Sequence, residues 1–174
     1  GVYNDYMKKF FTIFIVISAI LIGSFYALNS YIYNEKQADE TTETQEVKLY
    51  FYNPSLDQGV GGVQCTNKGL VEVVRTIPKT ETPLQDSIRL LLEGRITDEE
   101  KASGVTTEFP LTGLSLKSAN IKDGVATLEF IDPKNSTVGG SCRVAILWAQ
   151  ISTTAKQFSS VNEVRFTPEE LFQP

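Results

Sequence analysis

Histidine is absent from the 174 residues of this chain, which limits the chemistry that its side chains could perform. Without histidine the chain has no Ser-His-Asp or Cys-His catalysis, most catalytic zinc sites are excluded, and the usual acid–base group of neutral pH is missing. Carboxylates remain, and Asp57, Glu129 and Asp132 are the candidates for a carboxylate-dependent mechanism. We predict no catalytic residue and therefore no enzyme, with a carboxylate-dependent envelope hydrolase as the alternative.

Three further patterns resemble functional motifs but have simpler explanations. The adjacent pairs Glu99-Glu100 and Glu169-Glu170 do not form acid–base dyads, because neighbouring residues on a helix do not face each other. The loop 132–136 lacks the ligand number and spacing of a calcium loop, and turn formation accounts for its residues. No Lys-Ser/Thr pair follows the glycines of 59–62, so they do not form a phosphate-binding loop. We predict no metal ion and no cofactor.

Cys65 and Cys142 are the only cysteines. They lie too far apart in sequence for a CxxC redox motif, and two thiols without histidine make a poor metal site. Outside a membrane they would form a disulfide between the loop before the second strand and the start of the last helix. Such a bridge closes a long loop and would stabilise the domain by about 4 kcal/mol, less any strain. Two buried free thiols are the alternative.

Alternating or Val- and Ile-rich runs predict the strands that would position these residues. In the first run Val47, Leu49 and Phe51 alternate with polar residues and tyrosines, which indicates a half-buried strand. The sequence Lys122-Asp123-Gly124 favours a tight antiparallel hairpin. The predicted strands are 47–53, 70–77, 114–121, 125–131 and 161–166.

Start and stop signals predict three helices. Thr82 as the N-cap, Pro83, Gln85 in a capping box and a following Gly94 delimit the first, whose leucines and Ile88 form one apolar stripe. A second capping box predicts a short helix at 97–103, and apolar residues at helical spacing, including Trp148, predict a long helix at 141–158. The element order predicts an α+β domain with helices packed on one face of an antiparallel or mixed sheet.

A run without charge, residues 10–28, precedes this domain. At about 1.5 Å per residue a helix of this length spans roughly 28 Å, close to the thickness of a bilayer core. Lys8 and Lys9 come directly before it, which favours a cytoplasmic N-terminus. A cleaved secretory signal is the alternative, although no good small-x-small site follows the run.

The sequence therefore predicts a single-pass protein of the plasma membrane. A spacer rich in Glu, Thr and Gln follows the membrane segment and favours a disordered, extended tether. The predicted organisation is a cytoplasmic N-terminus (1–9), a transmembrane helix with its interface (10–33), a disordered linker (34–46) and one extracytoplasmic domain (47–174).

Net charge argues against a nucleic-acid partner. Three of the 16 Lys and Arg and six of the 21 Asp and Glu precede residue 47, so the domain carries 13 positive and 15 negative side chains and a net charge of −2. Binding to nucleic acid depends on neutralising phosphates, and the domain has no basic cluster for this purpose.

Several long segments of the domain resemble one family. They read VVRTIPKTETPLQDSIRLLLEG (73–94), TDEEKASG (97–104), LSLKSANIKDGVATLEF (114–130), GGSCRVAILWAQISTTAKQF (139–158) and VNEVRFTPEELFQP (161–174). Together they resemble the GerMN domain of sporulation and spore germination proteins. The resemblance implies a fold similar to the ring-building domains of secretion and spore-envelope assemblies, and binding rather than catalysis.

We therefore expect a membrane-anchored envelope protein whose outer domain binds protein partners or itself through a sheet edge or a helix face. A single domain copy and a transmembrane segment in place of a lipidated cysteine distinguish this chain from the spore-associated type. A general role in the cell envelope follows more directly than one in sporulation or germination. The alternative is a module that binds or cleaves cell-wall glycan (peptidoglycan).

Overall fold

The computed structural model describes residues 17–30 and 43–172, and the chain divides into two units, Gly1–Glu43 and Thr44–Pro174. In the first unit residues 17–30 are helical, and the large apolar side chains there, such as Leu21 and Phe25, are exposed. Across the described ranges, no helix has both the length and the apolar character needed to cross a bilayer. Residues 10–16 of the predicted span, and 31–42 of its interface and tether, lie outside the described residues.

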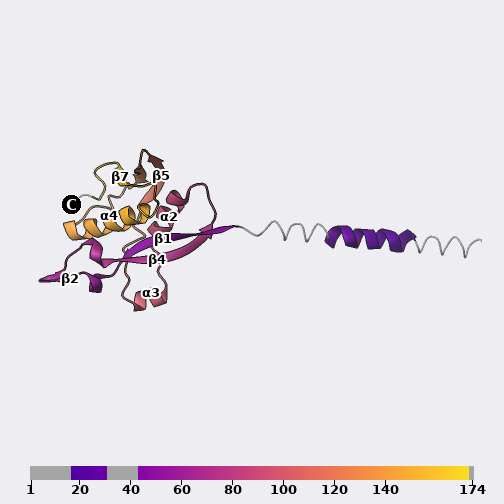
Figure 1. The fold of residues 1–174 in the computed structure, drawn as a ribbon, viewed down its shortest axis with the longest axis horizontal. Helices are drawn as coiled ribbons and strands as arrows, with labels where there is room; N and C mark the ends of the chain where they lie inside the picture. Colours follow the sequence, from indigo (N-terminus) through magenta and orange to yellow (C-terminus); the bar gives the residue numbers. More distant parts are fainter. Residues whose placement is uncertain (1–16, 31–42, 173–174) are drawn as a thin grey trace, which may run out of the picture. The chain divides into compact units, whose positions relative to one another are not determined.

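The second unit is an α+β domain, as the sequence predicts. Figure 1 shows α2 and α4 between the pair β1–β4 and the group that contains β5 and β7. The strands are β1 (Thr44–Tyr52), β2 (Gln58–Gly59), β3 (Gly62–Val63), β4 (Leu70–Pro78), β5 (Ser115–Lys122), β6 (Val125–Ile131) and β7 (Glu163–Thr167). The α-helices are α2 (Pro83–Leu92), α3 (Asp98–Ala102) and α4 (Ser141–Ala155), and 3-10 turns occur at Pro54–Leu56 and Asn67–Gly69.

The strands form separate sheets, and the prediction of one sheet is wrong in this respect. β1 pairs antiparallel with β4, whereas β6 lies between β5, antiparallel to it, and β7, parallel to it. β2 and β3 form a small hairpin.

The β1 strand has the alternation that its sequence predicts. Val47, Leu49 and Phe51 are at most 1% exposed and form part of the core. The strand starts earlier than expected, because residues 44–46 pair with the end of β4. The predicted linker is therefore wrong at its last three residues, which belong to the sheet.

The first two helices of the domain lie where start and stop signals place them. Leu84, Ile88 and Leu91 of α2 are buried, and α2 packs against both β1 and β5. The predicted capping box at the start of α2 is not present. The Thr82 side chain makes no cap hydrogen bond and instead donates to Asp86. The capping box of α3, between Thr97 and Glu100, is present.

Helix α4 packs against β1 and α2 and carries much of the core. Its buried stripe includes Val144, Leu147 and Ile151, but Trp148 is 41% exposed. Trp148 is one of the apolar residues whose spacing predicts this helix, but it does not belong to the buried stripe. The Trp148 ring packs edge-on against the ring of Phe166 in β7, with the ring centroids 6.3 Å apart. The rest of the indole faces solvent.

Candidate interaction surface

The outer edge of β1 is covered by side chains, and we call it the closed edge. The Gln157 amide accepts a hydrogen bond from the Lys48 N–H and donates one to the Lys48 carbonyl, both at 2.7 Å, much as a neighbouring strand would. The Thr154 hydroxyl accepts from the Tyr50 N–H at 3.1 Å. The backbone of Thr106 pairs with that of Tyr52 in an isolated antiparallel bridge. A further strand therefore has no place on this edge.

Among the described residues no strand covers the outer edge of β4, and we call it the open edge. The Arg75 guanidinium lies against its middle, where it donates to the Val74 carbonyl and to the Arg95 carbonyl, both at 3.1 Å. Alternate residues of an antiparallel strand direct their N–H and C=O groups toward opposite sides. The backbone groups of Lys48 and Tyr50 point away from β4, where Gln157 and Thr154 bind them. The backbone N–H and C=O groups of their register partners, Val74 and Glu72, therefore point away from β1, and so do those of Thr76. Within the described part of the chain, no strand pairs with β4 on this side. An edge of this kind is a template for another strand.

The side chains beside the open edge are partly neutralised. Glu72 accepts hydrogen bonds from Lys48 at 3.0 Å and from the Tyr50 hydroxyl at 2.9 Å. These bonds hold the pKa of the Glu72 carboxyl below its usual value, and the same bond raises the pKa of Lys48. Val74, next along the same face, is 46% exposed. The surface beside the edge therefore combines an internal ion pair with an accessible apolar side chain.

A hollow of about 410 Å³ lies between the C-terminal end of β4 and helix α2. Ile77 and Pro78 of β4 and Leu90 of α2 give it an apolar lining, and Asp86, Arg89 and Glu93 add charges. A strand added to β4 would place the side chains of one face near this hollow. The open edge and the hollow thus form one candidate surface for a protein segment.

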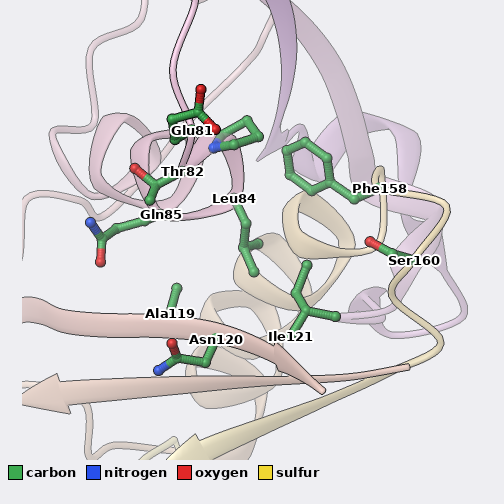
Figure 2. Close-up of a pocket in the computed structure, with 10 residues that line it drawn as sticks. Glu81, Thr82, Leu84, Gln85, Ala119, Asn120, Ile121, Phe158 and Ser160 are labelled. Atoms are coloured by element: carbon green, nitrogen blue, oxygen red, sulfur yellow. The ribbon is translucent and has the colours of Figure 1, made fainter. Parts of the chain in front are cut away.

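A second hollow, of about 260 Å³, lies beside β5 at the start of α2. Figure 2 shows Leu84 of α2 and Ile121 of β5 pointing toward each other across it, with Phe158 beside them. Gln85 and Asn120 line its rim. The apolar floor suits a side chain of a partner better than a polar substrate.

A third hollow, of about 360 Å³, is built on the aromatic side of α4. Trp148, Phe166 and Phe172 line it together with Arg165 and Glu169. Phe166 and Phe172 also contact each other, with ring centroids 5.1 Å apart. An exposed indole next to charged groups is a common feature of binding surfaces.

Asp57 and Asp132, two of the three candidate carboxylates, have structural partners. Asp57 is 2% exposed and accepts from the Tyr52 hydroxyl and the Thr66 hydroxyl, both at 2.6 Å. Asp132 accepts from the backbone N–H and the hydroxyl of both Ser136 and Thr137, at 2.8 to 2.9 Å. Both carboxylates therefore hold turns of the chain in place.

Glu129, the third candidate, lies on the exposed side of β6. It accepts from Lys117 at 2.7 Å and from Ser118 at 3.0 Å, both on β5. Since Asp57, Glu129 and Asp132 share no hydrogen-bond partner, the structure does not assemble them into one site.

The pKa values of these groups do not favour acid catalysis. Burial raises the pKa of Asp57 and Asp132, but the hydrogen bonds they accept outweigh it, so each pKa lies below its usual value. Hydrogen bonds from Lys117 and Ser118 lower the pKa of Glu129. A general acid requires a raised pKa, and these three carboxyls have the opposite shift. Burial and the hydrogen bond to Asp57 raise the pKa of Tyr52 to about 12.

The adjacent glutamates also have separate surroundings. The Glu100 carboxylate accepts a bidentate hydrogen bond from the Arg75 guanidinium, with both N···O distances 2.8 Å. This pair fixes α3 against β4. Glu99, Glu169 and Glu170 are exposed. Within the described residues, no group of three or more His, Cys, Asp or Glu side chains lies close enough to hold a metal ion.

Cys65 and Cys142 form a disulfide in the structure, with their Cα atoms 5.2 Å apart. The bond joins the segment after β3 to the first turn of α4. It therefore fixes the β2–β3 hairpin loop relative to the long helix.

The sequence does not indicate the open edge or the aromatic hollow. Whether a strand lies at the edge of a sheet depends on strand order, which local patterns do not encode. Pro78 at the end of β4 is consistent with an edge strand, because proline cannot donate to a ladder. No sequence signal identifies Gln157 as the cover of β1.

Comparisons with known proteins give one family match and similar solved structures. The family model Germane, described as sporulation and spore germination, matches residues 48–170. The first GerMN domain of the sporulation protein GerM from Bacillus subtilis is 18% identical, with a TM-score of 0.49, over 70% of this chain and 80% of that one. The tandem GerMN domains of the same protein are 21% identical, with a TM-score of 0.49, over 75% of this chain and 42% of that one. No curated protein matches the chain in sequence.

The family model spans β1 to β7 and therefore covers nearly all of the folded domain. The match also includes β4 and the helices α2 and α4, which pack against β1. This chain therefore belongs to the Germane family of sporulation and spore germination domains.

Proposed function

We propose that this chain is a single-pass membrane protein whose extracytoplasmic Germane domain binds other proteins, or itself, through the open edge of β4. The observation that carries the proposal is the difference between the two edges of the β1–β4 pair. Gln157, Thr154 and Thr106 cover the closed edge, whereas no strand of the described part pairs with the open edge. Strand addition to an exposed edge is a common way for a domain to recognise an extended segment of another protein.

The membrane anchor in this proposal is supported by the sequence before the domain. Residues 10–28 carry no charge, follow two lysines and are long enough for a membrane helix. The described helical residues 17–30 expose large apolar side chains along their length. Such a surface is stable in lipid, where apolar side chains have favourable contacts.

The proposed process is a role of the cell envelope related to sporulation, germination or the cell wall. The support is the description of the family, which names sporulation and spore germination. A domain that binds proteins would serve such a process as a structural component.

Site-specific photo-crosslinking in membranes tests the docking proposal. A photoreactive residue in place of Val74 on the open edge should yield protein adducts in the full-length chain. The same residue in place of Asp123, in the exposed turn after β5, provides the control. Adducts at position 74 and not at 123 would support the proposal, whereas no adduct at 74, or equal adducts at both positions, would contradict it.

A second candidate function, binding of cell-wall glycan, is favoured by the hollow beside Trp148. The exposed indole could stack on a sugar ring while Arg165 and Glu169 bind its hydroxyl groups. Among the described residues lining this hollow, Glu169 is the one carboxylate, so the pair needed for glycoside hydrolysis is missing.

Trp148 is the only tryptophan of the chain, so its fluorescence reports directly on this hollow. Soluble cell-wall fragments should shift its emission, and Trp148→Ala should abolish retention of the domain on insoluble cell wall. Unchanged emission together with no retention would remove this candidate.

A further inference from the structure

We propose that the disulfide between Cys65 and Cys142 is a redox-active site, at which a protein dithiol reduces the folded domain and releases the β2–β3 hairpin from helix α4. We call residues 58–65 the hairpin arm. The partner is defined by its chemistry, which is two neighbouring thiols that exchange with a disulfide, as in oxidoreductases with a CxxC motif. The open edge of β4 has no part in this proposal.

The disulfide lies where an external thiol can reach it. Cys142 is exposed, and Cys65 is half-buried. A Cβ atom added at Gly62 or at Gly140 would meet no atom within 4 Å, so the segments that lead to both cysteines border open space. Exposed disulfides are the ones that undergo exchange and serve regulation, whereas shielded ones resist reduction.

The hairpin arm has few other attachments to the domain, and Figure 1 shows β2 projecting from it. None of residues 58–65 is buried, and none belongs to the hydrophobic core. The hydrogen bonds of the arm are local, because Gln58 donates to the Pro54 carbonyl and the Gln64 N–H donates to the Asp57 carbonyl. The disulfide is therefore the main link between the arm and α4.

The base of the arm is held without the disulfide. The buried Asp57 carboxylate accepts hydrogen bonds from the Tyr52 hydroxyl and from both the N–H and the hydroxyl of Thr66. These bonds join the two ends of the arm and involve neither sulfur atom. Reduction therefore leaves the base intact, and the arm moves relative to α4 while the core stays folded.

The position of Cys142 gives the exchange a direction. Cys142 is the second residue of α4, a helix of 15 residues whose first turn has no acidic side chain and whose N-cap, Gly140, supplies no side-chain hydrogen bond. The unpaired N–H groups of a helix N-terminus stabilise a thiolate. A sulfur that is stable as a thiolate leaves a disulfide faster, so the incoming thiolate attacks Cys65 and Cys142 departs.

The reaction balances with the dithiol as the only reductant. Its first thiolate attacks the Cys65 sulfur, the S–S bond breaks, and the electron pair leaves on the Cys142 sulfur. The product is a mixed disulfide between the partner and Cys65. The second thiol of the partner loses its proton and attacks its own sulfur in the mixed disulfide, which releases Cys65 as a thiolate. The partner ends as a disulfide, and both cysteines take up protons to become thiols.

Reduction of the full-length chain in detergent, with dithiothreitol as the probe and no denaturant, tests whether the folded domain reacts. Alkylation of free thiols at timed intervals, followed by mass spectrometry, gives the rate. The rate should rise in proportion to the dithiothreitol concentration, while the far-UV circular dichroism stays unchanged. A rate that levels off at the rate of unfolding, or a loss of circular dichroism on reduction, would overturn the proposal.

A trapping experiment tests the partner class and the direction of exchange. A thioredoxin-type protein whose second active-site cysteine is changed to serine cannot complete the reaction and should remain bound as a mixed disulfide. After an acid quench and alkylation, peptide mapping should place the bond at Cys65 and the alkyl group at Cys142. A bond at Cys142 would overturn the direction, and no mixed disulfide would overturn the protein dithiol as partner.

Nuclear magnetic resonance relaxation tests release of the arm. On reduction, the backbone order parameters of the arm should fall below about 0.6, while those of β1 stay near about 0.85. The double variant Cys65→Ser/Cys142→Ser is the matched control. It should have a mobile arm without reductant and should not respond to reductant. Order parameters of the arm that do not change on reduction would show that other contacts hold it, and would overturn its release.

Discussion

At the scale of single residues, the carboxylates that first suggest catalysis act as fixed acceptors. Asp132 accepts four hydrogen bonds within the turn that leads from β6 toward α4, and one of its partners, Thr137, is fully buried. A carboxylate that accepts several N–H and O–H bonds is stabilised in its charged form. The local turn chemistry seen in the sequence and the lowered pKa of Asp132 therefore have the same cause.

We expect Asp132→Asn to destabilise the domain by about 1–3 kcal/mol near neutral pH, because the amide would present an N–H₂ group to donors. The pKa of Asp132 in the folded domain lies below its ordinary value of 3.8. The unfolded chain therefore binds the proton first as the pH falls. The stabilisation is fully present above the ordinary value and is lost as the pH falls through the lower, folded value.

Urea unfolding of the parent and Asp132→Asn from pH 7 to pH 2.5 measures this effect. The difference in unfolding free energy should be constant above the ordinary value of 3.8 and shrink below it. Asp123→Asn, an equal change of charge in an exposed turn, should behave like the parent. A difference between parent and Asp132→Asn that does not change over this range would contradict the account.

At the scale of elements, the closed edge of β1 depends on residues at the end of α4. Thr154 lies in the last turn of the helix and Gln157 just after it, and together they bind backbone groups of Tyr50 and Lys48. Uncovered edges invite pairing with other chains, and covering them with side chains prevents it. The asymmetry of the sheet therefore arises from where α4 ends.

We expect Gln157→Ala to expose the Lys48 N–H and to lower stability by about 1 kcal/mol, the typical net effect of a lost hydrogen bond. Amide hydrogen exchange should show faster exchange at Lys48, while Tyr50, bound by Thr154, stays protected. Gln157→Glu keeps an acceptor oxygen and should preserve the protection of Lys48. Unchanged exchange at Lys48 in Gln157→Ala would show that the amide does not cover this edge.

At the scale of the whole molecule, the disulfide joins residues that are 77 positions apart. A link that closes so long a loop restricts the unfolded chain, and the loop-entropy model gives a stabilisation of about 4 kcal/mol. The bond also holds the β2–β3 hairpin loop, whose tip residue Val60 is fully exposed, against α4.

We expect Cys142→Ser to lower the melting temperature by roughly 10 °C or more, given that stabilisation and the size of the domain. Reductant should lower the melting temperature of the parent to about that of the variant. Ser141→Ala, the neighbouring exposed position, is the control and should keep both the parent melting temperature and its response to reductant. Equal melting temperatures of the parent with and without reductant would contradict the role of the bond.

The proposed topology makes a prediction for the full-length chain in cells. If the domain lies outside the membrane, protease added to intact cells whose outer layers have been removed should digest it. A cytoplasmic marker protein, protected until the cells are opened, is the control. A domain that resists protease until the cells are opened would contradict the extracytoplasmic placement.

Much of the domain's secondary structure follows from local patterns in the sequence. The alternation of Val47, Leu49 and Phe51 predicts a strand with one buried face, and the structure confirms it. The Asp123-Gly124 pair likewise predicts a tight hairpin turn, because such turns require residues that tolerate a positive φ. In the structure both residues have a positive φ. The capping box of α3 is predicted because its two partners lie three residues apart.

Long-range geometry decides the rest. The sequence alone determines the α+β class, the order of the elements and the lack of histidine chemistry, because periodicity, turns and composition are local or summed properties. Only the tertiary structure decides that β1 is closed by Gln157, that β4 is open and that Trp148 faces solvent. Those features depend on which segments, distant in sequence, become neighbours, and hydrophobic burial of the core fixes these neighbours only when the whole chain folds.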